Sequence, residues 1–152
     1  MPDLAVHVCA ALVAGNAIRD PQGRALFYAG NCLPDLAHKT LSLAALSPPA
    51  FTEVTHTPFG ILLLSYAACL AFREDWRPRA FRLLAAGSLL HLLMDACKSN
   101  LGHGVIPWAF PFSLRRFEFG WYSPEESPGE LLPWALGAVL LSELLSRMMR
   151  RR

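Results

Sequence analysis

At 152 residues the chain is long enough for one domain with a real core and too short for two comfortable ones. It is 53% hydrophobic and 17% charged, whereas about a quarter of the residues in an ordinary soluble domain are charged. The formal net charge is only +2, and the basic residues form no aromatic-interleaved stripe of the kind that binds nucleic acid. These properties predict a single domain over residues 1–152 that contacts membrane lipid and does not bind DNA or RNA.

The N-terminal part of the chain predicts one helix and two shorter segments. Residues 4–18 are apolar on nearly every face and are followed by a turn sequence, Arg-Asp-Pro-Gln-Gly, which predicts a first helix. A second apolar run covers residues 24–33 and is expected to stop at Pro34, because proline cannot continue helical hydrogen bonding. Residues 39–50 are less apolar and close on two prolines, which predicts a short helix or turn along a surface.

The middle of the chain predicts two further helices. Pro58 is suited to the first turn of a helix that carries the apolar run on to residue 72. A charged break at residues 73–82 follows, and the next apolar segment predicts a helix that ends near Lys98.

The C-terminal part of the chain predicts a loop and a last helix. Residues 99–129 are rich in glycine, proline and aromatic residues, a composition typical of an ordered cap or an interfacial segment. A last apolar helix is expected over residues 130–146. The fold class predicted for the chain is therefore all-α, a small membrane bundle of four to five apolar helices with a Gly/Pro/aromatic-rich loop.

The basic residues are distributed unevenly over the connections between these segments. If the apolar segments alternate in direction, the turns at 19–24, 73–82 and 147–152 lie on one side, with ten of the fourteen basic residues. The ten are Arg19, Arg24, Arg73, Arg77, Arg79, Arg82, Arg147, Arg150, Arg151 and Arg152. The positive-inside rule then predicts a multi-pass membrane protein with these turns and the C-terminus in the cytoplasm. Because the apolar runs are short for full spans, the bundle is expected to be tilted, thinned or partly inserted.

One helix carries a histidine and an aspartate that can bind the same metal ion. His91 and Asp95 are four residues apart, so they lie one turn apart on a single helix face. An aspartate that faces lipid costs roughly 2.5 to 3.5 kcal/mol, and ionisable residues inside a membrane are therefore usually functional. The pair predicts two ligands of a metal site.

Four more residues can complete a ligand set of nitrogen and oxygen atoms suited to Zn²⁺, Mn²⁺ or Fe. They are His7, Asp35, His38 and His56. Six candidates exceed what one tetrahedral zinc needs, so one ion or two ions bridged by a carboxylate are both open. Structural interpretations also stay open: His7 as a core histidine, Asp35 as a cap of the turn after Pro34, and His56 as a cap of the next helix.

Four motifs resemble a known family. They are LPDLAH at 33–38, THTPFGILLL at 55–64, GSLLHLLMDA at 87–96 and GVIPWAFPFS at 104–113. In this order and spacing they resemble the bacterial membrane-bound, metal-dependent hydrolase family typified by YdjM. The resemblance implies a bacterial inner-membrane protein and a metal-ligand set made of His7, Asp35, His38, His56, His91 and Asp95.

The arrangement is also similar to the helical zinc-dependent phospholipase C and nuclease group, in which a His-x-x-x-Asp helix supplies a metal-bridging aspartate. That similarity implies that Asp95 bridges and that Asp35 is a ligand or base, which makes both catalytic. The implied reaction is cleavage of a lipid or small-molecule phosphoester by metal-activated water, with Arg115 and Arg116 as substrate contacts. Two alternatives remain. One is a non-catalytic integral membrane protein with a structural metal or a polar helix-packing cluster, and the other is a soluble helical phosphodiesterase.

Overall fold

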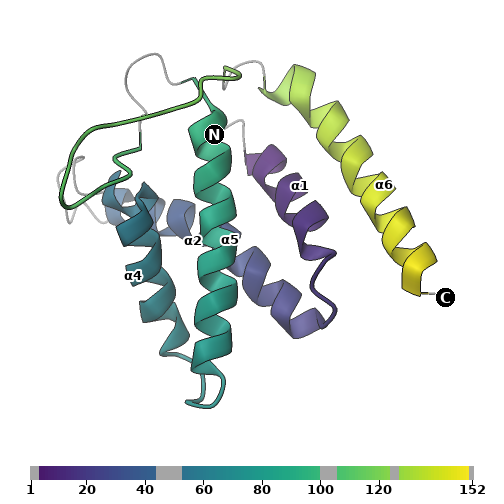
Figure 1. Cartoon of the computed structure of the whole chain (residues 1–152), viewed down its shortest axis with the longest axis horizontal. Coiled ribbons are helices and arrows are strands. Elements are labelled where there is room, and N and C mark those ends of the chain that lie inside the picture. Colours follow the sequence, from purple (N-terminus) through teal and green to yellow (C-terminus); the bar gives the residue numbers. More distant parts are fainter. Residues whose placement is uncertain (1–3, 44–52, 100–105, 124–126, 151–152) are drawn as a thin grey trace.

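The structure is a computed structural model that describes residues 4–43, 53–99, 106–123 and 127–150. These residues form helices, loops and two isolated β-bridges, which confirms the all-α prediction (Figure 1). The α-helices are α1 (Leu4–Gly15), α2 (Pro21–Leu43), α4 (Pro58–Cys69), α5 (Arg77–Cys97) and α6 (Leu132–Arg150). A 3₁₀ turn, η1 (Glu53–His56), precedes α4, and a π-helical turn, η2 (Ser127–Leu131), leads into α6.

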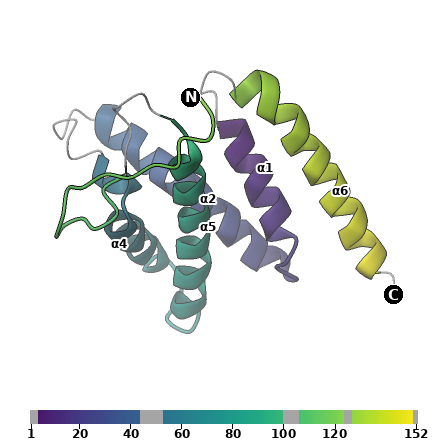
Figure 2. The same cartoon turned by 45° about the horizontal axis from the view of Figure 1, so that its top comes forward.

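The helices are arranged around α2 and α5, which make the most extensive contact between elements in the described residues. Helix α2 runs obliquely behind α5, α4 packs beside α5, and α6 lies along α1 at the outer side of the bundle (Figures 1 and 2). One core cluster, which includes Leu26 and Leu84, fills the space between α2, α4 and α5. A second, which includes Ile61 and Leu92, joins α4 and α5 to the loop at Ile106.

Two glycines allow α2 and α5 to approach backbone to backbone. A Cβ atom on Gly30 would lie 2.2 Å from the carbonyl oxygen of Leu84, and one on Gly87 would lie 2.0 Å from that of Phe27. No side chain fits at such distances, so glycine is required at both positions. The close crossing brings Asp35, which follows Gly30 on α2, next to His91 on α5.

The prediction that a helix stops at Pro34 is wrong, because α2 continues through this proline to Leu43. Proline has no N–H group to donate to the carbonyl of Gly30, one turn earlier. The hydroxyl of Ser88 on α5 donates to that carbonyl at 2.8 Å instead. Neighbouring helices can satisfy a carbonyl freed by proline in this way.

The continuation of α2 changes the setting of the residues that follow Pro34. Asp35 and His38 lie within a helix, about one turn apart, and not in a turn after it. The separate short helix or turn expected over residues 39–50 is also corrected, since residues 39–43 are the last part of α2. The remainder of that expected segment lies outside the described residues.

The other helix boundaries differ from the expected ones by a few residues. Helix α1 ends at Gly15, and residues 16–18 continue as tighter turns in which each N–H bonds to a carbonyl three residues back. Thr57 caps α4 by accepting a hydrogen bond from the N–H of Gly60 at 2.9 Å. The capping role considered for His56 therefore belongs to its neighbour, and the His56 side chain is available for other contacts.

Two stretches of helix are long and apolar enough to cross a membrane, Arg77–Cys97 and Gly129–Met149, each of 21 residues. Helices α1 and α4 have 12 residues each, which at about 1.5 Å per residue is well short of a bilayer core of about 30 Å. Helix α6 exposes large apolar side chains, with Trp134 81% and Leu140 67% exposed. An apolar surface of this kind is expected where a helix contacts lipid.

Candidate metal centre

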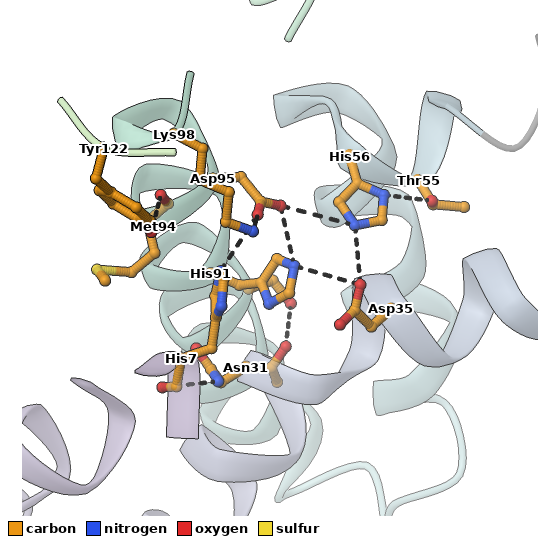
Figure 3. Close-up of polar contacts among 12 residues, drawn as sticks. His7, Asn31, Asp35, Thr55, His56, His91, Met94, Asp95, Lys98 and Tyr122 are labelled. Atoms are coloured by element: carbon orange, nitrogen blue, oxygen red, sulfur yellow. Dashed lines mark hydrogen bonds and ion pairs between the residues drawn. The ribbon is translucent and has the colours of Figure 1, made fainter. Parts of the chain in front are cut away.

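Five predicted ligands meet at one end of the bundle, and they come from four different elements (Figure 3). His91 and Asp95 lie on the last turns of α5, as the four-residue spacing predicts. Asp35 reaches them from α2, His56 from η1, and His7 from the first turns of α1. The structure therefore brings together residues separated by more than eighty positions in the sequence.

Each carboxylate in this cluster faces histidine nitrogens. Oδ1 of Asp95 lies 3.3 Å from Nε2 of His7, while its Oδ2 lies 3.1 Å from Nε2 of His91 and 3.8 Å from Nε2 of His56. Oδ1 of Asp35 lies 3.3 Å from Nε2 of His56 and 3.7 Å from Nε2 of His91. Ligand atoms about 2.0–2.1 Å from a tetrahedral zinc ion are about 3.3 Å apart, so these separations suit a shared ion.

The cluster has a buried floor and a partly exposed rim. The side chains of His7 and His91 are 2% exposed, those of Asp35 and Asp95 16%, and that of His56 20%. Both ring nitrogens of His91 are buried and, within the described part of the chain, lack a partner with hydrogen-bond geometry. Buried polar nitrogens are normally satisfied, so Nε2 of His91 is oriented as a metal ligand would be.

Two groups of three residues could each hold a metal ion, because the ligand atoms within a group all lie within 4.8 Å of one another. The two groups share His91. The first is His7, His91 and Asp95, and the second is Asp35, His56 and His91. All the donor atoms are imidazole nitrogen or carboxylate oxygen, the set that zinc, manganese and iron accept. The residues present therefore fit a divalent metal ion.

Asp35 lies on α2, which is not one of the two candidate membrane spans. Burial alone would raise its pKa, but the hydrogen bond with His56 and the electrostatic interactions with His91 and His56 outweigh this effect. The pKa of Asp35 is therefore held below its ordinary value, and the residue presents a charged carboxylate to the cluster.

His38, the sixth predicted ligand, lies beside the cluster. Its ring meets that of His56 edge to face, with the ring centroids 5.4 Å apart. Among the described residues it belongs to neither group with ligand atoms in range. The role of His38 as a ligand stays a prediction.

Two neighbours of the cluster were missed from the sequence. Thr55 is 5% exposed, and its hydroxyl lies 3.0 Å from Nδ1 of His56, a contact that turns Nε2 of that ring toward the carboxylates. Lys98 contacts Oδ1 of Asp95 through its ammonium group. The signals were the Thr-His pair of the THT motif and a lysine three residues after Asp95.

The arginines considered as substrate contacts lie on the loop that follows α5. Arg116 forms an ion pair with Glu53 at 2.8 Å, and both side chains are more than 40% exposed. Arg115 is also exposed. The ion pair between Arg116 and Glu53 joins this loop to the start of η1, the turn that carries His56. The role of either arginine in substrate binding stays a prediction.

The fold and the cluster define a class of protein: a small all-helical protein with apolar helices of membrane length and a group of histidines and aspartates at one end. The sequence model of the YdjM inner membrane protein family matches residues 4–151. The chain therefore belongs to that family and is a membrane protein, which confirms the family resemblance seen in the motifs. No curated protein and no solved structure matches the chain, and the likeness to the phospholipase C group stays a prediction.

Proposed function

We propose that the chain is a membrane-embedded, metal-dependent hydrolase that cleaves a phosphoester. One observation carries the proposal: two carboxylates and three histidines from α1, α2, η1 and α5 converge on one point. Burying ionisable groups in a membrane protein is costly, so a cluster of this size is better explained by a ligand than by helix packing.

In this proposal a divalent ion is held by residues of two overlapping groups that share His91, namely His7, His91 and Asp95, and Asp35, His56 and His91. A bound divalent ion, most suitably Zn²⁺ with Mn²⁺ or Fe as alternatives, would supply the Lewis acidity that activates water and polarises the phosphoester. His7 and His91 form the buried floor and exclude water from that side. Asp35, whose carboxylate is partly exposed beside this floor, would accept the proton of the attacking water.

The exposed rim favours a catalytic centre over a purely structural one. A structural zinc site is closed by its protein ligands, whereas a catalytic site keeps an open position. Here Asp35, Asp95 and His56 are 16–20% exposed beside a floor that is 2% exposed. This partial exposure supports access for water and for a substrate head group.

The proposal includes an orientation in the membrane. Three segments lie at one end of the bundle: the α1–α2 connection, the α4–α5 connection and the end of α6 (Figure 1). These segments hold the described arginines of the basic turns. The histidine–aspartate cluster lies at the other end. With the basic end in the cytoplasm, as the positive-inside rule favours, the substrate would be a lipid or small-molecule phosphoester on the opposite side of the inner membrane.

The proposal is tested by metal analysis and a hydrolysis assay on detergent-purified protein. We expect the wild-type chain to carry a divalent metal and to hydrolyse bis(p-nitrophenyl) phosphate. His91→Ala and Asp95→Ala should lose both, whereas Asp75→Ala, which removes an exposed carboxylate, should retain both. Equal and negligible metal in all four proteins would refute the metal centre. Bound metal without hydrolysis of any phosphoester would favour the structural alternative.

A further inference from the structure

Lys98 places a positive charge inside the cluster. It directly follows α5 as the C-cap residue, where the backbone turns from helical to extended. Its side chain is 12% exposed, which is low for a lysine, and its ammonium contacts Oδ1 of Asp95 (Figure 3). Among the lysines and arginines that the structure describes, it is the one with an ion pair to Asp35 or Asp95.

The loop that follows α5 fixes the position of Lys98. The N–H of Ser99 donates to the carbonyl of Tyr122 at 2.7 Å, and the N–H of Trp121 donates to that of Cys97 at 2.8 Å. Lys98 and Tyr122 form an isolated β-bridge between these two bonds. These bonds hold the backbone on both sides of Lys98, and from this position its ammonium contacts Asp95.

The two oxygens of Asp95 have different neighbours. Oδ2 faces His91 and His56, while Oδ1 faces His7 and Lys98. In a two-ion centre, a bridging carboxylate gives one oxygen to each ion. At Asp95 the ammonium of Lys98 occupies the side on which a second ion would bind.

We infer that Lys98 replaces the second cation of this centre: the site holds one divalent ion, and the Lys98 ammonium contacts an anionic oxygen of a phosphodiester substrate. This inference rests on the proposed function and names its substrate class. The ammonium then stabilises negative charge that develops on the phosphoester oxygens, as fixed cations do in phosphoryl transfer.

The charge of the cluster selects a phosphodiester. Two carboxylates and one ammonium leave a single negative charge, and one divalent ion changes this to a single positive charge. A phosphodiester carries one negative charge, whereas a phosphomonoester carries about 1.5 to 2 at neutral pH. One ion together with Lys98 therefore balances a diester.

The test compares Lys98→Met and Lys98→Arg with the wild type in the full-length, detergent-purified protein. Zn²⁺ is titrated into each protein, and dimethyl phosphate, a diester anion, is titrated into the Zn²⁺-loaded form. We expect the wild type to bind one Zn²⁺ per chain. Lys98→Met should bind Zn²⁺ about tenfold more tightly and dimethyl phosphate about tenfold more weakly, because a nearby positive charge has been removed. Lys98→Arg, which keeps the charge, should stay close to the wild type in both.

Tighter Zn²⁺ binding together with weaker dimethyl phosphate binding by Lys98→Met is expected only if the Lys98 charge faces the site. A lysine with a purely structural role would not shift the two affinities in opposite directions. Weaker binding of both probes by Lys98→Met, or unchanged binding of dimethyl phosphate, would overturn the inference. Two Zn²⁺ ions per wild-type chain would also overturn it, and would leave the proposed hydrolase intact. A wild-type chain that binds no Zn²⁺, Mn²⁺ or Fe would refute the proposed function itself.

Discussion

Ser88 shows how a single hydroxyl supports a proline in the middle of a helix. Its Oγ donates to the carbonyl of Gly30, which Pro34 leaves without a partner. We predict that Ser88→Ala lowers the free energy of unfolding by about 1–3 kcal/mol, because a buried carbonyl loses its donor. Chemical unfolding in detergent micelles, followed by circular dichroism, measures the change.

A double-mutant cycle separates this hydrogen bond from general packing effects. In Pro34→Ala the residue at position 34 regains an N–H that can donate to the carbonyl of Gly30, so Ser88→Ala should cost less there. Ser42→Ala, at an exposed position near the end of α2, serves as the control and should have little effect. An equal cost of Ser88→Ala in both backgrounds would contradict the role assigned to Ser88.

Thr55 acts on the metal centre through His56. Its hydroxyl contacts Nδ1 of the ring, which leaves Nε2 for the carboxylates and for an ion. Loss of an outer partner of this kind typically lowers metal affinity about 10–100-fold. We therefore predict weaker Zn²⁺ binding by Thr55→Val with unchanged thermal stability. Thr40→Val, which removes a hydroxyl from an exposed site on α2, is the matched control. Wild-type affinity in Thr55→Val would exclude this role.

At the scale of elements, the crossing of α2 and α5 positions the site. Gly87 lies so close to the backbone of α2 that a Cβ atom would be 2.0 Å from the carbonyl oxygen of Phe27. We predict that Gly87→Ala forces the helices apart, lowers the free energy of unfolding by about 1–3 kcal/mol and weakens metal binding. Metal binding should fall because Asp35 moves away from His91.

Gly137 on α6 offers a matched control for this substitution, since a Cβ atom there would meet nothing within 4 Å. Gly137→Ala should raise stability by about 0.5–1 kcal/mol through the helix preference of alanine. Thermal unfolding and metal content of the two variants test the prediction. Similar behaviour of both alanine variants would show that the close crossing does not control the site.

The sequence predicted those helices whose signals are local, namely an apolar run of residues and a proline in the first turn. A helix beginning at Pro58 was expected and is α4, and the apolar segment after the charged break at residues 73–82 was expected to be helical and lies in α5. Helix α5 begins earlier than expected, at Arg77 within that break. Helix α2 was misread because the effect of Pro34 depends on Ser88, 58 residues beyond its partner Gly30. A rule about proline in an isolated helix does not contain that contact.

At the scale of the whole molecule, the described arginines of the basic turns and the histidine–aspartate cluster lie at opposite ends. We predict that a reporter protein that becomes fluorescent only in the cytoplasm is active when fused after residue 152, because Arg147 and the arginines at 150–152 favour that side. A reporter enzyme that is active only outside the cytoplasm should be inactive at the same position. The reverse pattern would overturn the proposed orientation and would move the substrate to the cytoplasmic side.

Taken alone, the sequence determined the class of the chain: an all-helical membrane protein of a particular family, with His91 and Asp95 on one helix face. These features follow from local composition and from a spacing of four residues, which a helix converts directly into proximity. Only the tertiary structure decided that α2 passes through Pro34, that Thr55 turns His56, and that Lys98 lies against Asp95. The path of α2 depends on the contact between Ser88 on α5 and the carbonyl of Gly30. The contacts of Thr55 and Lys98 are local in sequence, but they act on one site only because the packed helices bring His56 and Asp95 together.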